Sequence, residues 1–82
     1  MSLTLYHSAE CPYCARVRGH LAEEGITVPM KDIHATPAHR DELIKIGGKA
    51  QVPCLVIDGK ALYESLNIIA WFKKNCPPPS KT

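Results

Sequence analysis

Alternating and helix-period patterns of apolar residues predict a strand, a helix and a second strand in the first part of the chain. Residues 3–6 alternate apolar and polar positions, and residues 26–31 do the same around Pro29, which favours an edge strand. Between them, apolar positions recur at helical spacing from Pro12, which suits a first helical turn, to Gly25, which suits a helix end. The chain therefore begins as βαβ.

A second helix is expected after residue 36, because both its start and its stop signals are present. Thr36 suits the N-cap and Pro37 the first helical position, while Gly47 stands just past the expected end. Leu43 and Ile46 fall on one face of this helix, which would be the buried face.

A β-hairpin and a closing helix are expected in the last third of the chain. Residues 53–57 and 60–63 are typical of strands, and the Asp-Gly pair between them favours a two-residue hairpin turn. Ser65 can cap a last helix over residues 66–74, in which lysines near the C-terminus suit the helix dipole. Leu66, Ile69, Ala70 and Lys73 recur on successive turns of that helix.

The order of these elements and the composition indicate one small α/β domain. Its first two strands should be parallel and joined by a right-handed crossover, in two or three layers. With 82 residues the chain can form one domain with one modest core, which we place at residues 1–76, followed by a proline-rich tail at 77–82.

Charge and hydropathy argue against several classes of partner. The net charge of +2 is too small to favour nucleic acid or an anionic membrane. No apolar stretch approaches the roughly 20 residues that span a bilayer, and the first residues lack the pattern of a secretory signal. We therefore expect a cytoplasmic protein, and we expect it to be a monomer.

The spacing of the four cysteines favours redox chemistry over a structural role. Cys11 and Cys14 form one tight pair, whereas Cys54 and Cys76 stand far apart, which is not typical of a secreted disulfide scaffold. Half of a zinc site is an alternative for the pair. Neither the other cysteines nor the four histidines show the spacing of two further zinc ligands, so we expect no metal.

The two paired cysteines should have different roles in thiol–disulfide exchange. Cys11 is placed at a helix N-terminus, where unsatisfied N–H groups and the helix dipole favour a thiolate, so we expect it to be the nucleophile. Cys14 lies one turn further in and is the expected resolving thiol. Glu10 would oppose the thiolate, and Arg16 and Arg18 are expected on other faces of the helix.

The run Cys-Pro-Tyr-Cys at 11–14, after a first strand, resembles the active site of dithiol glutaredoxins. The resemblance extends over nearly the whole chain, because Gln-Val-Pro at 51–53 is similar to the family's Val-Pro segment, in which the peptide bond is cis and faces the cysteines. It implies a thioredoxin-like (glutaredoxin) fold of order βαβαββα, with a four-stranded mixed sheet flanked by three helices. Without the resemblance, Pro53 could simply open a strand in trans.

Residues 63–69 depart from the usual glutaredoxin Gly-Gly segment and resemble the Glu-Ser motif of glutathione transferase N-terminal domains. In that family the pair holds the γ-glutamyl end of glutathione, and the chemistry agrees, since Ser65 at a helix N-terminus suits the carboxylate and Glu64 suits the ammonium. Ser65 could equally be only a helix cap. The glutathione-binding set implied by resemblance is Tyr13, Lys49, Gln51, Val52, Pro53, Glu64 and Ser65.

Within that set, each end of glutathione has its own implied partners. The backbone of Val52 would pair with the cysteinyl part. Lys49 and Gln51 resemble the residues that bind the glycine carboxylate, although Lys49 could be an ordinary solvated loop lysine. Many glutaredoxins carry a basic residue shortly before the first cysteine, but residues 8–10 contain no Lys or Arg.

The remaining two cysteines and the two aromatic residues near the C-terminus have expected places that follow from their residue types. Cys54 follows Pro53 and lies either near the active pair or in the core as a small filler. Cys76, close to the tail, could be an exposed thiol open to modification. Trp71 and Phe72 are expected to belong to the core or its partly buried edge.

The resemblance implies a glutaredoxin, a glutathione-dependent enzyme that reduces protein–glutathione mixed disulfides and other disulfides at Cys11. Its implied co-substrate is glutathione, and its partners are glutathionylated or disulfide-bonded proteins. An alternative is a carrier that shares an iron–sulfur cluster through Cys11 and bound glutathione. A transferase N-terminal fragment is a third reading, but the helical second domain is absent and transferases usually lack a Cys-x-x-Cys pair.

Overall fold

The computed structural model describes residues 2–75, and its seven elements follow the predicted order. The strands are β1 (Leu3–His7), β2 (Met30–Asp32), β3 (Cys54–Ile57) and β4 (Lys60–Tyr63). The helices are α1 (Pro12–Glu23), α2 (Pro37–Gly47) and α3 (Ser65–Asn75). The predicted proline-rich tail and Cys76 lie outside the described residues, so the expected domain boundary stays a prediction.

The four strands form one mixed sheet in the order β2-β1-β3-β4. β1 is parallel to β2 and antiparallel to β3, so Leu5 pairs with Met30 on one side and Leu55 on the other. β3 and β4 form the predicted hairpin, whose turn places Asp58 at φ 48° and Gly59 at φ 85°, as two-residue hairpin turns with positive φ require. The predicted four-stranded sheet with three helices is confirmed.

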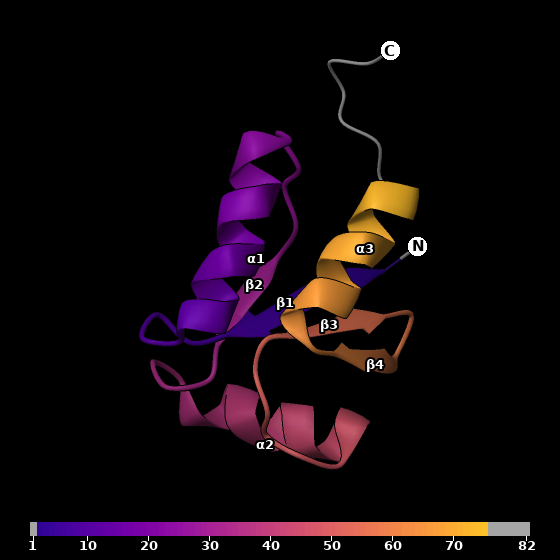
Figure 1. The fold of residues 1–82 in the computed structure, drawn as a ribbon. Coiled ribbons are helices and arrows are strands. Elements are labelled where there is room, and N and C mark those ends of the chain that lie inside the picture. Colours follow the sequence, from indigo (N-terminus) through magenta and orange to yellow (C-terminus); the bar gives the residue numbers. More distant parts are fainter. Residues whose placement is uncertain (1, 76–82) are drawn as a thin grey trace.

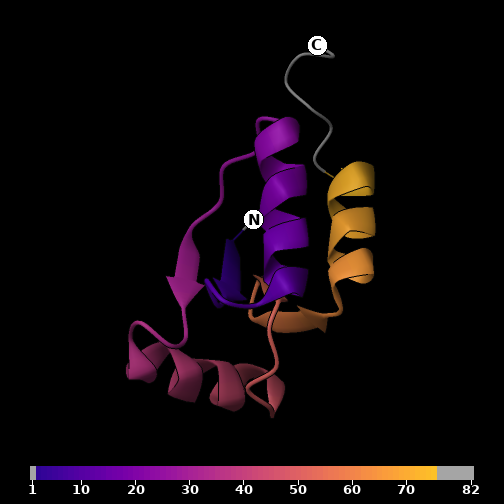
Figure 2. The ribbon, with the colours of Figure 1, turned by 60° about the vertical axis from the view of Figure 1, so that its left-hand side comes forward.

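The helices cover both faces of this sheet (Figure 1). α1 and α3 lie side by side on one face and α2 lies on the other, which gives three layers in both views (Figure 2). A larger apolar cluster fills the α1/α3 side and a smaller one the α2 side. The fully buried side chains of the larger cluster are Leu5, Val17, Leu21, Leu55, Ile68 and Phe72. The structure therefore has an apolar core on each side of the sheet, whereas the length of the chain predicted a single core.

The second strand begins later than predicted. Its pairing with β1 covers only residues 30–32, although the N–H of Leu5 also donates to the carbonyl of Pro29. The N–H of Ile26 donates instead to the carbonyl of Leu21, 2.9 Å away, at the end of α1. This bond holds the start of the segment against the helix, so regular pairing starts only after Pro29. The predicted edge position is confirmed.

α2 ends one residue later than predicted and buries only part of the expected face. Gly47 is the last helical residue, and Gly48 at φ 87° is the left-handed C-cap, with its N–H donating to the carbonyl of Ile44. Leu43 is fully buried as predicted, but Ile46 is 38% exposed, because the inward side of this helix runs through His39, Leu43 and Gly47. Thr36 stands at the N-cap position without a side-chain capping bond.

α3 buries only some of the residues that its helical spacing singled out. Leu66 is 66% exposed and Ile69 packs against the larger cluster, while the fully inward positions are Ser65, Ile68 and Phe72. The helix starts at Ser65 itself, and the preceding Glu64, at φ 77°, offers its carbonyl to the N–H of Ile68. This turn orients Ser65 toward the core. As a result Ile68 and Phe72, four residues apart, are buried, and Leu66 faces solvent.

Candidate active site

The paired cysteines occupy the start of α1, where β1 passes into the helix through a short loop. Cys11 is the N-cap residue, with extended backbone angles and no side-chain cap, and Pro12 follows at the first helical position. Cys14 is fully buried and accepts a hydrogen bond from the N–H of Ser8 at 3.4 Å. The partly exposed thiol thus stands at the helix N-terminus and the buried thiol one turn further, as predicted.

The surroundings of the two thiols move their pKa values in opposite directions. Burial, the largest single effect, raises the pKa of Cys11, but hydrogen bonds from the main chain and side chain of Cys14 and from the N–H of Tyr13, aided by the charge of Arg18, bring it below its usual value. Burial raises the pKa of Cys14 to about 12. Cys11 is therefore the thiol that ionises first.

The segment before β3 lies next to the nucleophile candidate. The Val52–Pro53 peptide bond is cis, as the resemblance implied. The Cys11 Sγ lies 3.9 Å from the carbonyl oxygen of Val52, although the two residues are 41 positions apart. Pairing of β1 with β3 brings these segments together, because Tyr6 pairs with Cys54 at the same end of the sheet.

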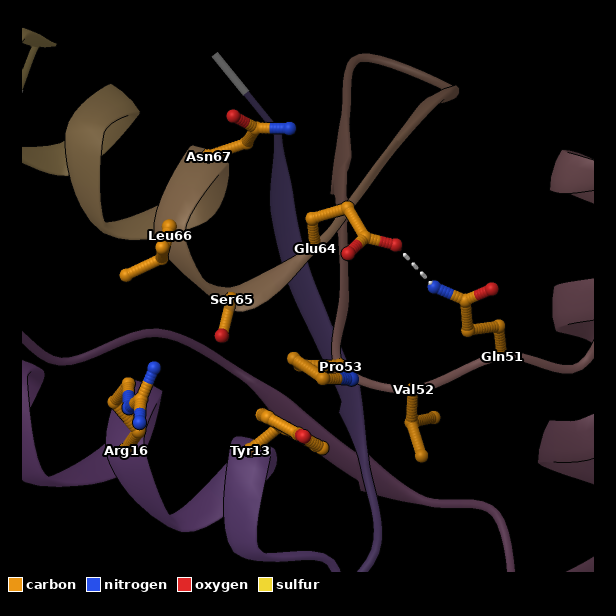
Figure 3. A pocket seen from close by; sticks show the side chains of 9 residues that line it. All are labelled: Tyr13, Arg16, Gln51, Val52, Pro53, Glu64, Ser65, Leu66 and Asn67. Carbon is orange, nitrogen blue, oxygen red and sulfur yellow. Dashed lines mark hydrogen bonds between the residues drawn. The ribbon is translucent and has the colours of Figure 1, made fainter.

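A groove of about 600 Å³ opens between α1, the residues before β3 and the start of α3 (Figure 3). Side chains from α1 form one wall, and the residues before β3 and at the start of α3 form the other. Its lining residues are Tyr13, Arg16, Gln51, Val52, Pro53, Glu64, Ser65, Leu66 and Asn67. Such a volume lies within the range of small-molecule sites, roughly 300–1,000 Å³.

One hydrogen bond joins two segments of the groove wall. The Gln51 side-chain amide donates to the Glu64 carboxylate at 2.7 Å (Figure 3). Glu64 adopts φ 77°, a left-handed conformation that is uncommon for a residue with a side chain. Such positions are enriched at binding sites. The following Ser65 is 7% exposed, at the first turn of α3, where backbone N–H groups lack helical partners.

The structure brings together six of the seven residues that the resemblance assigned to glutathione. The seventh, Lys49, does not line the groove; its Nζ lies 4.5 Å from the centre of the Tyr63 ring. The groove also includes Arg16, Leu66 and Asn67, which the sequence analysis did not assign to it. Arg16 lies one turn after Tyr13 on the same side of α1, a spacing that could have indicated its place in the groove.

Cys54 and the aromatic pair of α3 take structural places. Cys54 is fully buried in the α2-side core, and burial raises the pKa of its thiol to about 11. The prediction of a core filler fits this position. Phe72 is fully buried and Trp71 packs against the same cluster, as predicted.

The described residues contain no cluster of typical metal ligands and no helix that could span a membrane. Over residues 2–75, no group of three or more His, Cys, Asp or Glu side chains could hold a metal ion. In the same part of the chain, the helices are too short and too polar to cross a membrane.

Comparison with known proteins gives similarities of sequence and of structure. A profile of the glutathione S-transferase N-terminal domain matches residues 5–80. Glutaredoxin 3 of Escherichia coli is 32% identical over 59 residues, which cover 72% of this chain and 71% of that protein.

Solved structures match over a similar length. Glutathione transferase Omega 3C from Trametes versicolor is 33% identical, with a TM-score of 0.76, over 90% of this chain and 33% of its own. The chain thus spans about a third of that transferase. A thioredoxin-like protein with a TM-score of 0.73 is 22% identical over 89% of this chain and 96% of its own, and shows the fold. The profile match, the glutaredoxin 3 relative and the shared architecture together mean that the chain belongs to the glutaredoxins, in the family of the glutathione S-transferase N-terminal domain and with the thioredoxin fold.

Proposed function

We propose that this chain is a glutathione-dependent thiol–disulfide oxidoreductase that reduces protein–glutathione mixed disulfides through Cys11. The family supports the coarser function, a glutathione-related thiol oxidoreductase. The observation that carries the finer one is the position of Cys11: an N-cap thiol with a lowered pKa, whose Sγ lies 3.9 Å from the main chain of a groove residue. Glutathione held in that groove would present its sulfur next to the nucleophile.

The polar groups of the groove fit glutathione, which carries one ammonium and two carboxylates. Glu64 offers a carboxylate to the ammonium, while Ser65 and the free N–H groups of the first turn of α3 offer donors to the neighbouring carboxylate. Arg16 lies across the groove from Ser65 and adds a cation on the α1 side (Figure 3). The main chain of Val52 is available to the cysteinyl part.

The proposed reaction begins at Cys11. Its thiolate attacks the glutathione sulfur of a mixed disulfide, a new S–S bond forms between Cys11 and glutathione, and the protein thiolate leaves and takes a proton from water. A second glutathione thiolate then attacks the glutathione sulfur held on Cys11, which yields oxidised glutathione and restores the Cys11 thiolate. Cys14 is not needed in this cycle.

Reduction of a disulfide between two protein cysteines requires Cys14 as well as Cys11. When a protein stays linked to Cys11, the Cys14 thiolate can attack Cys11 Sγ and release the protein by forming the Cys11–Cys14 disulfide. The resolving thiol is in the same chain, one helical turn away, so the step benefits from a high effective concentration. The two cysteine variants should therefore separate the two routes.

The test compares Cys11→Ser and Cys14→Ser on a glutathionylated peptide and on a protein disulfide, at equal glutathione. Cys11→Ser should abolish both activities, because it removes the thiol with the lowered pKa. Cys14→Ser should keep or raise deglutathionylation, since Cys14 can no longer divert the intermediate into the internal disulfide, and should lose most of the protein-disulfide activity. Cys54→Ser, outside the groove, is the matched control and should leave both activities near wild type.

Three results would contradict the proposal. Substantial turnover by Cys11→Ser would reassign the nucleophile. Equal loss of both activities in Cys14→Ser would reject the monothiol route. Glutathione conjugation to an electrophile, with no disulfide turnover in the wild type, would favour a transferase instead.

A further inference from the structure

Ser8, in the loop before Cys11, is buried and has all of its polar groups engaged. The residue is 2% exposed, and its N–H donates to Cys14 Sγ at 3.4 Å. Its carbonyl accepts from the N–H of Cys11 and from Arg18, each at 3.2 Å. Its hydroxyl lies 2.8 Å from Nδ1 of His34. One residue thus connects both cysteines to a histidine 26 positions away.

His34 is itself held in place, just after β2. One carboxylate oxygen of Asp32 accepts from the N–H groups of His34, at 2.8 Å, and of Ala35, at 3.0 Å. The other oxygen accepts from the N–H of Ala9 at 3.3 Å. Asp32 therefore ties the loop that carries Ser8 to the loop that carries His34, and it fixes the main chain from which the exposed His34 side chain reaches the Ser8 hydroxyl.

We propose that Ser8 and His34 are positioning residues for the resolving thiol, with the His34–Ser8 hydrogen bond aiming the Ser8 N–H at Cys14 Sγ. The inference rests on the proposed dithiol function. Cys14 is buried, and the thiolate that it must form has few other means of stabilisation. The donated N–H favours this anion, together with the charge of Arg18, so a well-aligned Ser8 speeds the resolving step.

The step affected can be written in full. The Cys14 thiol first loses its proton to water, and the thiolate electron pair forms a bond to Cys11 Sγ. The bond between Cys11 and the bound sulfur breaks, and that sulfur leaves with the bonding pair and takes up a proton. No outside oxidant or reductant is consumed, because the disulfide passes from one pair of sulfurs to another. Ser8 acts on the anion that starts this step.

The first attack by Cys11 depends on other groups. The hydrogen bonds that lower the pKa of Cys11 come from Cys14 and Tyr13. The glutathione groove does not include Ser8 or His34. Loss of the His34–Ser8 bond should therefore slow internal disulfide formation and spare deglutathionylation by the monothiol route.

The experiment uses His34→Ala and His34→Asn, because an Asn side chain can place a polar atom close to the position of Nδ1. His39→Ala is the matched control: its Nδ1 contacts the carbonyl of Asp32 at 3.3 Å and does not reach Ser8. Each variant is loaded with glutathione on Cys11, and the appearance of the Cys11–Cys14 disulfide is followed by acid quench and mass spectrometry. Steady-state deglutathionylation and thermal stability are measured on the same samples.

We expect His34→Ala to slow internal disulfide formation about fivefold, the effect of one lost neutral hydrogen bond, while His34→Asn and His39→Ala stay close to wild type. The pH midpoint of this rate should rise in His34→Ala, because the Cys14 thiolate loses support. The other charged or titratable groups of this cluster, Cys11, Arg18, His7 and Asp32, are unchanged in all three variants.

The outcomes separate this inference from the proposed function. If wild type deglutathionylates but His34→Ala forms the internal disulfide at the wild-type rate, the positioning role is wrong and the function stands. If His34→Ala loses both activities equally, or His34→Asn restores nothing, the bond is only structural and the inference is overturned. If wild type shows no deglutathionylation at all, the proposed function fails first.

Discussion

Two cysteines three positions apart have pKa values that shift in opposite directions in this protein: the pKa of Cys11 is lowered and that of Cys14 is raised. The sequence predicted the direction of the difference, because a helix N-terminus after a strand could be recognised from residues 3–12. The sequence did not predict the Ser8 N–H on Cys14, since a main-chain contact depends on the path of the loop. Nor did it assign Arg16 to the groove, because the partner wall comes from a helix 50 residues away in the chain.

The first residue-scale prediction concerns the pKa of Cys11. The side chain of Cys14 donates a hydrogen bond that lowers this pKa. Cys14→Ser keeps a donor and Cys14→Ala does not, so Cys11 should titrate at higher pH in Cys14→Ala than in Cys14→Ser. The measurement is the ultraviolet absorbance of the thiolate against pH, in which the buried Cys54 titrates separately, near its raised pKa of about 11. Identical titrations would show that the side-chain bond is unimportant.

The second residue-scale prediction compares two cations near the groove. Arg16 lines the groove, whereas Lys49 rests over the Tyr63 ring. Arg16→Ala should raise the KM for glutathione by roughly three- to tenfold, since a partly solvated charge-assisted contact is lost, and should leave kcat nearly unchanged. Lys49→Ala is the matched variant and should change the KM less. A larger rise of the KM in Lys49→Ala than in Arg16→Ala would instead support Lys49 as the residue that binds the glycine carboxylate of glutathione.

At the scale of elements, start and stop residues predicted the helices better than apolar stripes predicted their buried faces. Thr36, Pro37 and the glycines located α2 to within a residue. For α3, helical spacing singled out Leu66, which is exposed, because the turn at Glu64 sets which side of the helix faces the sheet. Tertiary contacts therefore decide the face where hydrophobic periodicity is ambiguous.

Two helical glycines provide an element-scale prediction with opposite signs. A Cβ on Gly47 would overlap the Tyr63 hydroxyl and lie 3.0 Å from the Ala61 Cβ, whereas one on Gly19 in α1 would meet nothing within 4 Å. Gly47→Ala should lower the free energy of unfolding by roughly 1–3 kcal/mol through overpacking. Gly19→Ala should raise it by roughly 0.5–1 kcal/mol, because alanine loses less entropy in a helix.

Urea denaturation of both variants checks this pair. The control is Gly47→Ala in a Tyr63→Phe background, where removal of the hydroxyl should recover part of the loss. If Gly47→Ala stabilises the protein as Gly19→Ala is expected to do, then α2 and β4 are not in close contact at this point.

At the scale of the whole molecule, the sheet separates two apolar cores, and the one on the α2 side contains the buried Cys54 thiol. The parallel β1–β2 pair and the hairpin were predictable from the order of the elements, whereas the single four-stranded mixed sheet was implied by the resemblance to glutaredoxins. The split of the core was not predictable, since it depends on which helices share a face of the sheet.

The buried thiols predict how the stability of the whole protein depends on pH. Burial raises the pKa of Cys54 from 9.0 to about 11, and that of Cys14 from 9.0 to about 12. Above about pH 9 the unfolded chain loses these protons while the folded chain keeps them, so the unfolded state binds fewer protons and stability falls as pH rises. Below pH 9 the two groups have no such effect.

Urea unfolding under reducing conditions measures this dependence. Cys54→Ala should flatten the decline between about pH 9 and 11, whatever its effect on stability at neutral pH. An unchanged slope in that variant would show that the Cys54 thiol ionises in the folded protein as easily as in the unfolded one.

The first strand of the chain lies inside the sheet, and its antiparallel partner is made late: Leu3 pairs with Ile57 and Tyr6 with Cys54. On the ribosome, a chain that has just completed α1 already carries Cys11 and Cys14, but it lacks both neighbours of β1, since β2 and β3 follow α1 in the chain. It also lacks Val52 and the groove wall that α3 begins. The hydrogen bonds that lower the pKa of Cys11 come from α1 itself, whereas the burial that raises the pKa of Cys14 needs distant pairings, which form only when both partners exist. We therefore expect chaperone or oxidant contact during synthesis to meet a Cys14 thiol that is still accessible, and redox specificity to be complete only after the hairpin has been made.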